Sequence, residues 1–162
     1  MLTALCAAFL LFLVYSAPLL PARMASHFGG NGQANGWMNR DTDLCFLGAM
    51  GVGVPLLFFI LGLVIRLVPD QLINLPHREY WLSPEQRAAT GAFISRQLLW
   101  LGCLMILFLA GIHYLTIQAN RLTPARLPMD LFLALLGGFL VAVAGWLIHL
   151  IRHFANVPKT RS

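Results

Sequence analysis

The segment LTALCAAFLLFLVYSAPLL, residues 2–20, contains no Asp, Glu, Lys, Arg or His. A helix needs about 20 mostly apolar residues to cross the hydrocarbon core of a bilayer. Three further segments meet this requirement, at residues 44–65, 98–117 and 131–151. The sequence therefore predicts an all-α fold, a single membrane domain over residues 1–162 that forms a bundle of four transmembrane helices.

The overall composition excludes a water-soluble globule. Hydrophobic residues make up 59% of the chain and charged residues only 10%, whereas soluble domains carry about 25% charged residues. The net charge of +5 fits cationic segments beside a membrane. Because no run of Lys and Arg is long enough for a nucleic-acid-binding tail, we expect no nucleic-acid partner. Cys6, Cys45 and Cys103 are odd in number and form no CxxC pair, which favours free thiols over disulfides or a zinc site.

The basic residues between the spans predict the orientation. The second connection, residues 66–97, and the C-terminal tail hold seven Arg and Lys, Lys159 and Arg161 among them. The first connection, residues 21–43, and the third hold four. Basic residues favour the cytoplasmic side, so we expect both termini in the cytoplasm and residues 21–43 outside, in a bacterial inner membrane. A cleaved signal peptide is the alternative for residues 2–20, but the basic n-region and the A-x-A cleavage pattern are missing.

Local signals predict where helices begin and bend. Ser83, followed by Pro84 and then Gln86, is typical of a helix start with a capping box, and Asp130 can cap the fourth span. Pro55 removes a backbone hydrogen bond within the second span, so we expect a kink there.

A stripe of small residues marks the fourth span. Ala134, Gly138 and Ala142 recur every four residues, and Gly145 follows Gly138 by one heptad. Such a stripe lets another helix backbone approach closely. It predicts packing inside the chain or, as the alternative, self-association.

Residues 21–43 form a polar, turn-rich connection between two apolar spans. The Gly and Asn residues, Asn35-Gly36 in particular, are typical of tight turns. A compact re-entry loop would explain the turns but not the chemistry of the other side chains. As the alternative we predict a recognition surface for a peptide or a lipid head group, carried by the following residues: Arg23, His27, Asn35, Trp37 and Arg40. A metal site made by His27 with Asp41 and Asp43 is a third, weaker hypothesis.

The same stretch resembles a bacterial membrane domain family of unknown function. The family pattern reads L-P-x-x-I-x-x-H, then a glycine, then D-G-W and a basic residue. In this sequence Leu20-Pro21, His27, Gly32 and Gly36-Trp37 match it, whereas Met24, Asn35 and Arg40 replace Ile, Asp and Lys. The similarity covers about residues 5–65, and the best-known relatives are the SdpI-type immunity and signalling proteins.

The resemblance implies a function of a particular kind. SdpI-type proteins protect a producing cell from a secreted membrane-active toxin peptide, and they relay its presence by recruiting a repressor to the membrane. By resemblance, the chain would bind such a peptide on its outer surface and a regulator on its inner surface. Residues 74–82 are also similar to small uncharacterised relatives of this group.

A second candidate surface lies in residues 66–97. His77, Arg78, Tyr80 and Trp81 are either an interfacial belt that holds the segment against head groups or a docking site for a cytoplasmic partner.

The remaining histidines lie in or near the spans. His113 is an ionisable group inside the third span and therefore a functional candidate, alone or paired with His27. His149 and His153, four residues apart, have the spacing of a two-ligand metal clamp or, more plainly, lie at a helix end that favours cations.

The sequence offers no sign of enzyme chemistry. It contains no G-x-S-x-G, H-E-x-x-H or phosphate-binding glycine loop, and its six carboxylates lie outside the apolar centres of the spans. We therefore expect a non-catalytic membrane protein without a cofactor or resident metal. The alternatives are an accessory subunit of a larger membrane complex and a metal-binding membrane protein.

Overall fold

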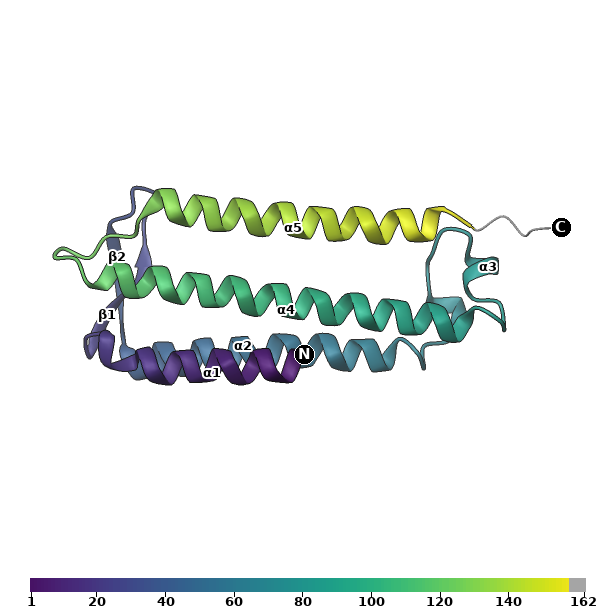
Figure 1. Ribbon diagram of the computed structural model, residues 1–162, viewed down its shortest axis with the longest axis horizontal. Helices are drawn as coiled ribbons and strands as arrows, with labels where there is room; N and C mark the ends of the chain where they lie inside the picture. The colour runs from purple at the N-terminus through teal and green to yellow at the C-terminus, as the bar shows by residue number, and fades with distance from the viewer. Residues whose placement is uncertain (158–162) are drawn as a thin grey trace.

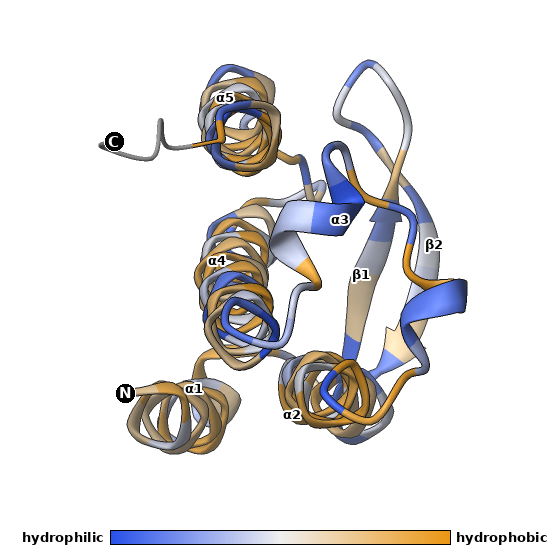
Figure 2. Ribbon diagram, turned by 90° about the vertical axis from the view of Figure 1, so that its right-hand side faces the viewer, coloured by the Kyte–Doolittle hydropathy of each residue, from blue (hydrophilic) through white to orange (hydrophobic). Residues whose placement is uncertain are grey.

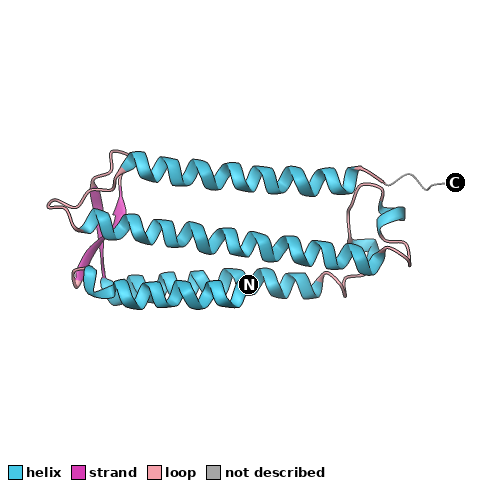
Figure 3. Ribbon diagram, in the orientation of Figure 1, coloured by secondary structure: helices cyan, strands magenta, loops and turns pink. Residues whose placement is uncertain are grey.

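The computed structural model describes residues 1–157, so Lys159 and Arg161 of the predicted basic tail lie outside the described residues. Its elements follow one another along the chain in this order: α1 (Leu2–Ser16), the 3₁₀ turn η1 (Ala17–Leu19), β1 (Arg23–Phe28), β2 (Ala34–Asn39), α2 (Arg40–Val64), the 3₁₀ turn η2 (Asp70–Leu72), α3 (Arg78–Trp81), α4 (Arg87–Asn120) and α5 (Met129–Ala155). Figures 1 and 3 show the long helices side by side, with the strands at one end and the short α3 at the other.

The four long helices confirm the predicted fold class. Each is long and apolar enough to cross a membrane, at Leu2–Leu19, Arg40–Val64, Arg87–Asn120 and Met129–Ala155. Figure 2 shows that apolar residues dominate them and that polar residues gather in the short α3 and in the connections. The chain is thus a small multi-pass membrane protein. We name its two ends the hairpin end and the α3 end; that the hairpin end faces outward remains a prediction.

Helix α4 occupies the centre of the bundle. It packs against α1, α2, α5 and β1, and Figure 2 shows α5 on one side of it and the α1–α2 pair on the other. Two glycines permit the close packing of the α1–α2–α4 unit. A Cβ on Gly51 would lie 2.1 Å from the ring of Phe9, and a Cβ on Gly102 would lie 3.4 Å from Pro55 Cα. Helix α2 continues through the buried Pro55, from Arg40 to Val64.

Helix α5 is the least buried of the four. Phe154 is its one buried residue. Ala134, Gly138 and Ala142 line a groove of about 370 Å³ whose other wall is α4. No atom lies within 4 Å of where a Cβ on Gly138 or Gly145 would sit. The small-residue stripe therefore faces α4 in part, without close packing.

Two of the predicted helix starts are wrong. Helix α4 begins at Arg87, because the carbonyl of Ser83 accepts hydrogen bonds from the amides of Gln86 and Arg87 and so closes a turn before the helix. Helix α5 begins at Met129 after Pro128, so Asp130 lies inside the first turn and makes no capping hydrogen bond.

Candidate functional site

The connection at residues 21–43, expected as a loop of turns, contains a β-hairpin. Strands β1 and β2 pair antiparallel, with Arg23 opposite Asn39, Ala25 opposite Trp37 and His27 opposite Gly36. The turn between them requires glycine at one position. Gly32 has a φ of +78°, and a Cβ there would lie 2.7 Å from the Leu127 carbonyl oxygen. The Gly- and Asn-rich sequence that predicts turns thus also closes a hairpin.

Strand β1 is fastened to the bundle. Met24 and Ala25 are 0% and 1% exposed, and Met24 packs against Leu20 and Ile117. The Asn120 side chain at the end of α4 accepts from the Ala25 amide at 2.8 Å and donates to the Ala25 carbonyl at 2.9 Å. One amide side chain therefore satisfies both backbone groups of a buried strand residue.

The hairpin tip is fastened to the connection between α4 and α5. The amide of Leu127 donates to the carbonyl of Gly32 at 2.8 Å, and Gln33 forms an isolated β-bridge with Arg126. The hairpin is thus held at its base, along β1 and at its tip.

The outer face of the hairpin carries four of the five predicted recognition residues. Arg23, His27, Asn35 and Trp37 are all exposed, and the Trp37 side chain is 54% exposed. His27 Nδ1 and Asn35 Oδ1 share a short hydrogen bond across the hairpin. Gly36 makes this arrangement possible, because a Cβ on it would lie 2.8 Å from His27 Cβ.

Arg40, the fifth predicted residue, lies at the base of the hairpin rather than on its outer face. It is the first residue of α2, and its amide donates to the carbonyl of Ala22 at 3.0 Å. Its Nε lies 2.9 Å from Asp41 Oδ1. The carboxylate of Asp41 therefore offsets the positive charge that a ligand would meet at Arg40.

The sequence does not predict the positions of two further residues at this end, the exposed Met38 and the half-buried Asn120. Met38, 39% exposed, stands opposite the buried Met24 and adds exposed apolar surface to β2 on the other face from Trp37. Asn120 holds β1, yet its backbone partner lies 95 residues away in the sequence. The one available signal is a polar amide at the end of an apolar span.

The histidines do not gather into a metal site. Within residues 1–157, no three His, Cys, Asp or Glu side chains are placed to hold a metal ion. His113 is fully buried against α1, where it lies edge-on to Phe12 and shares a 2.7 Å hydrogen bond with the Ser16 hydroxyl. His27 instead bonds within the hairpin, so the structure does not bring these two histidines together as a pair.

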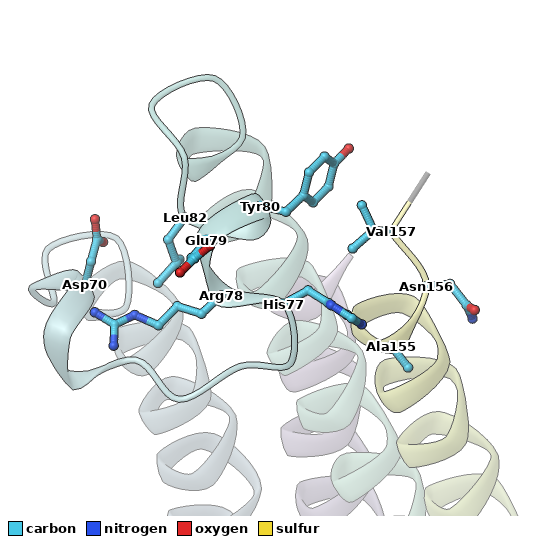
Figure 4. Close-up of a pocket in the computed structure, with 9 residues that line it drawn as sticks. All are labelled: Asp70, His77, Arg78, Glu79, Tyr80, Leu82, Ala155, Asn156 and Val157. Atoms are coloured by element: carbon cyan, nitrogen blue, oxygen red, sulfur yellow. The ribbon is translucent and has the colours of Figure 1, made fainter. Parts of the chain in front are cut away.

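Three of the four residues predicted for partner docking lie beside a cavity at the α3 end. His77, Arg78 and Tyr80 line this cavity of about 1150 Å³ together with the last residue of α5 and the two residues that follow it. Figure 4 shows the His77 side chain directed toward the end of α5 and Arg78 directed toward Asp70. His77 has a positive φ of 50°, which is uncommon outside glycine. The segment is therefore held in one particular backbone conformation at this cavity.

Trp81, the fourth residue, lies in the interior. It is 7% exposed, and its Nε1 donates to the Phe154 carbonyl at 3.0 Å. Its ring contacts Tyr80 and His153, and Phe93 completes the cluster. Trp81 thus fastens the α3 segment to the end of α5 and is not available to a partner.

His149 and His153 take part in the same aromatic cluster. The ring of His153 stacks on Phe93 with centroids 3.7 Å apart, and His149 lies 5.9 Å from the same ring. Neither predicted role of these histidines, as a metal clamp or as a charged helix end, includes this aromatic packing. The packing could not be predicted because the sequence does not show that Phe93 lies opposite α5.

Arg87 and Thr90 fasten the rest of the α3 end. Arg87 Nε lies 2.7 Å from Asp70 Oδ1, and its Nη2 donates to the carbonyls of Ile65 and Val68 at the end of α2. Thr90 Oγ1 donates to the Trp81 carbonyl at 2.7 Å. The connection from α2 to α4 is therefore held on the start of α4.

The fold and the two candidate surfaces define a multi-pass membrane protein with a structured hairpin at one end and a polar cavity at the other. Residues 4–52 match a family model described as a domain of unknown function (DUF1648). The matched part comprises most of α1, the hairpin and the first half of α2. No curated protein and no solved structure matches the chain.

Proposed function

We propose that this chain is a non-catalytic recognition protein of the bacterial cytoplasmic membrane, with the hairpin outside and both termini inside. Its ligand is a membrane-active peptide, and its role is immunity or signalling. One observation carries this proposal: a hairpin fastened at three places presents an aromatic and cationic face to the surroundings. A rigid surface loses little conformational entropy on binding, so its exposed side chains are suited to recognition.

The second strand supplies a binding mode. Among residues 1–157 the sheet has two strands only. On the outer edge of β2, the amide of Ala34 bonds to the Ala125 carbonyl, and from residue 35 onward no strand of the described chain lies beside this edge. An extended peptide can add to such an edge through backbone hydrogen bonds. Trp37 and Met38 lie on this strand and would contact the apolar side chains of the peptide. Arg23 and His27 would contact its polar groups.

The cavity at the α3 end is the corresponding site for a cytoplasmic regulator. His77, Arg78 and Tyr80 supply an imidazole, a guanidinium cation and a phenol, respectively, within one opening. An acidic or hydrogen-bonding segment of a partner would complement them.

The test combines survival with direct binding. Sensitive cells express the wild type, Trp37→Ala, His27→Ala or an empty vector, at membrane levels matched by blotting, and are challenged with membrane-active peptides from the source organism and its neighbours. Trp100→Ala is the matched control, because Trp100 is also about half exposed but lies on α4 away from the hairpin. The proposal predicts protection by the wild type and Trp100→Ala and its loss in Trp37→Ala.

Binding of the same peptides to the purified chain in nanodiscs gives the second readout. Equal binding by Trp37→Ala and the wild type would refute the hairpin as the recognition surface. No protection and no binding with any peptide would refute the immunity role.

An accessory subunit is the second candidate function, and the exposure of α5 favours it. None of its most apolar window is buried inside the chain, and Gly137 and Gly138 have open space beside them. A helix of a larger complex could pack there. Co-purification of a defined partner in mild detergent, lost in Gly138→Leu, would support this function.

A further inference from the structure

A separate cavity of about 650 Å³ lies at the hairpin end, between the last turns of α4 and the first turn of α5. Tyr114, Gln118 and Arg121 line it from the α4 side, and Arg126 and Asp130 line it from the connection and α5. No residue of β1 or β2 lines this cavity. It is therefore distinct from the outer face of the hairpin.

The charged groups of the cavity have no ionic partners among residues 1–157. Among residues 1–157 the ion pairs are Arg40 with Asp41 and Arg87 with Asp70. Arg121 makes one long hydrogen bond, from Nη1 to Gln118 Oε1 at 3.4 Å. Two guanidinium groups and one carboxylate are thus available to a ligand at a single opening.

The depth of the cavity indicates the kind of ligand. Tyr114 and Leu131 belong to the apolar parts of α4 and α5, whereas Arg121 and Arg126 lie beyond those parts. Head groups of a bilayer lie at this boundary, and Tyr and Arg side chains are favoured there. A ligand with a charged head and an apolar tail fits both halves of the lining.

We propose that this cavity binds an amine-bearing zwitterionic phospholipid such as phosphatidylethanolamine. Arg121 and Arg126 hold the phosphodiester, because guanidinium groups form paired, charge-assisted hydrogen bonds with phosphate oxygens. Asp130 accepts hydrogen bonds from the primary ammonium group. The acyl chains leave along Tyr114 and Leu131.

Asp130 decides between lipid classes. Phosphatidylglycerol offers no cation to this carboxylate, and the quaternary ammonium of phosphatidylcholine has no N–H to donate. A site of two cations alone would favour the anionic lipid, so the carboxylate is the specificity-determining group.

The experiment is native mass spectrometry of the full chain, released from detergent with equal amounts of phosphatidylethanolamine, phosphatidylglycerol and phosphatidylcholine. The wild type should retain mainly phosphatidylethanolamine. Arg121→Gln and Arg126→Gln should each lower its retention roughly tenfold, the loss of a charge-assisted hydrogen bond. Asp130→Asn should remove the preference for phosphatidylethanolamine over phosphatidylglycerol.

The matched control is Arg23→Gln, which removes one exposed charge from the same end without touching the cavity. Retention in this variant should equal that of the wild type. Equal retention of the three lipids by the wild type, or an equal loss in Arg23→Gln and Arg126→Gln, would overturn the proposal. An unchanged preference in Asp130→Asn would overturn the assignment of the amine.

Discussion

Replacing Asn120 with alanine should release β1 from the bundle without unfolding the helices. The Asn120 side chain makes two hydrogen bonds to Ala25, and Ala25 is 1% exposed. A buried backbone group that loses its partner costs about 1–3 kcal/mol. With two such groups left unpaired, we expect local opening of the hairpin to become easier by about 3 kcal/mol.

Hydrogen–deuterium exchange of the purified chain in nanodiscs measures this opening directly. A change of about 3 kcal/mol corresponds to exchange about 100-fold faster for amides of β1. Amides in the centre of α4 should exchange at the wild-type rate. Gln118→Ala is the control, because it removes a side-chain amide of the same helix that bonds to the exposed Arg121 and not to the hairpin.

Two results would refute the reasoning. Unchanged exchange in β1 would mean that the packing of Met24 alone holds the strand. Faster exchange along the whole of α4 would mean that Asn120 stabilises the helix, through its third hydrogen bond to the Thr116 carbonyl, rather than the hairpin.

Three further substitutions test individual contacts. Gly36→Ala should displace His27, because the new Cβ would lie 2.8 Å from that of His27, and the His27 imidazole resonances should shift in NMR spectra; Gly30→Ala, in open space, should leave them unchanged. Trp81→Phe keeps a ring in the aromatic cluster but removes one hydrogen bond to α5. A denaturant titration should show a free energy of unfolding lower by about 1 kcal/mol. A decrease as large as that caused by deleting a whole buried ring, about 3–5 kcal/mol, would contradict this account. Arg87→Gln removes the guanidinium that binds one carboxylate and two carbonyls, and should speed proteolysis of the connection between α2 and α4. An unchanged cleavage rate would show that these Arg87 contacts do not hold the connection in place.

The sequence predicts the helices because membrane insertion depends on local hydropathy. Each of the four apolar segments satisfies its own backbone hydrogen bonds as a helix, whatever its neighbours do. Their number and approximate limits can therefore be read without knowing how they pack. The starts of α4 and α5 could not, because Ser83 closes a turn and Pro128 sets the first turn of α5.

The candidate site is predicted less completely, since its geometry depends on distant partners. His27 and Asn35 are eight residues apart and meet across the hairpin, so a turn-rich segment was enough to suggest a surface. Trp81 has the composition of an interfacial residue, yet its hydrogen bond reaches Phe154, 73 residues away. Aromatic residues near an apolar span can face either lipid or protein, and the sequence alone does not distinguish these two environments.

The same long-range contacts determine how the two ends of the molecule could communicate. Asn120 holds the hairpin at one end of α4, and Thr90 holds the α3 segment near the other. Helix α4 has 34 residues, a length of about 51 Å at 1.5 Å per residue. A continuous helix of this length moves more readily as a rigid body than by stretching, so a peptide that shifts β1 would have to shift α4 along or about its axis. Because α5 contacts α4 along its length, with Phe139 stacked on Phe108 and Trp146 Nε1 donating to the Gln97 carbonyl, that movement would carry α5 with it and so reach the cavity beside His77.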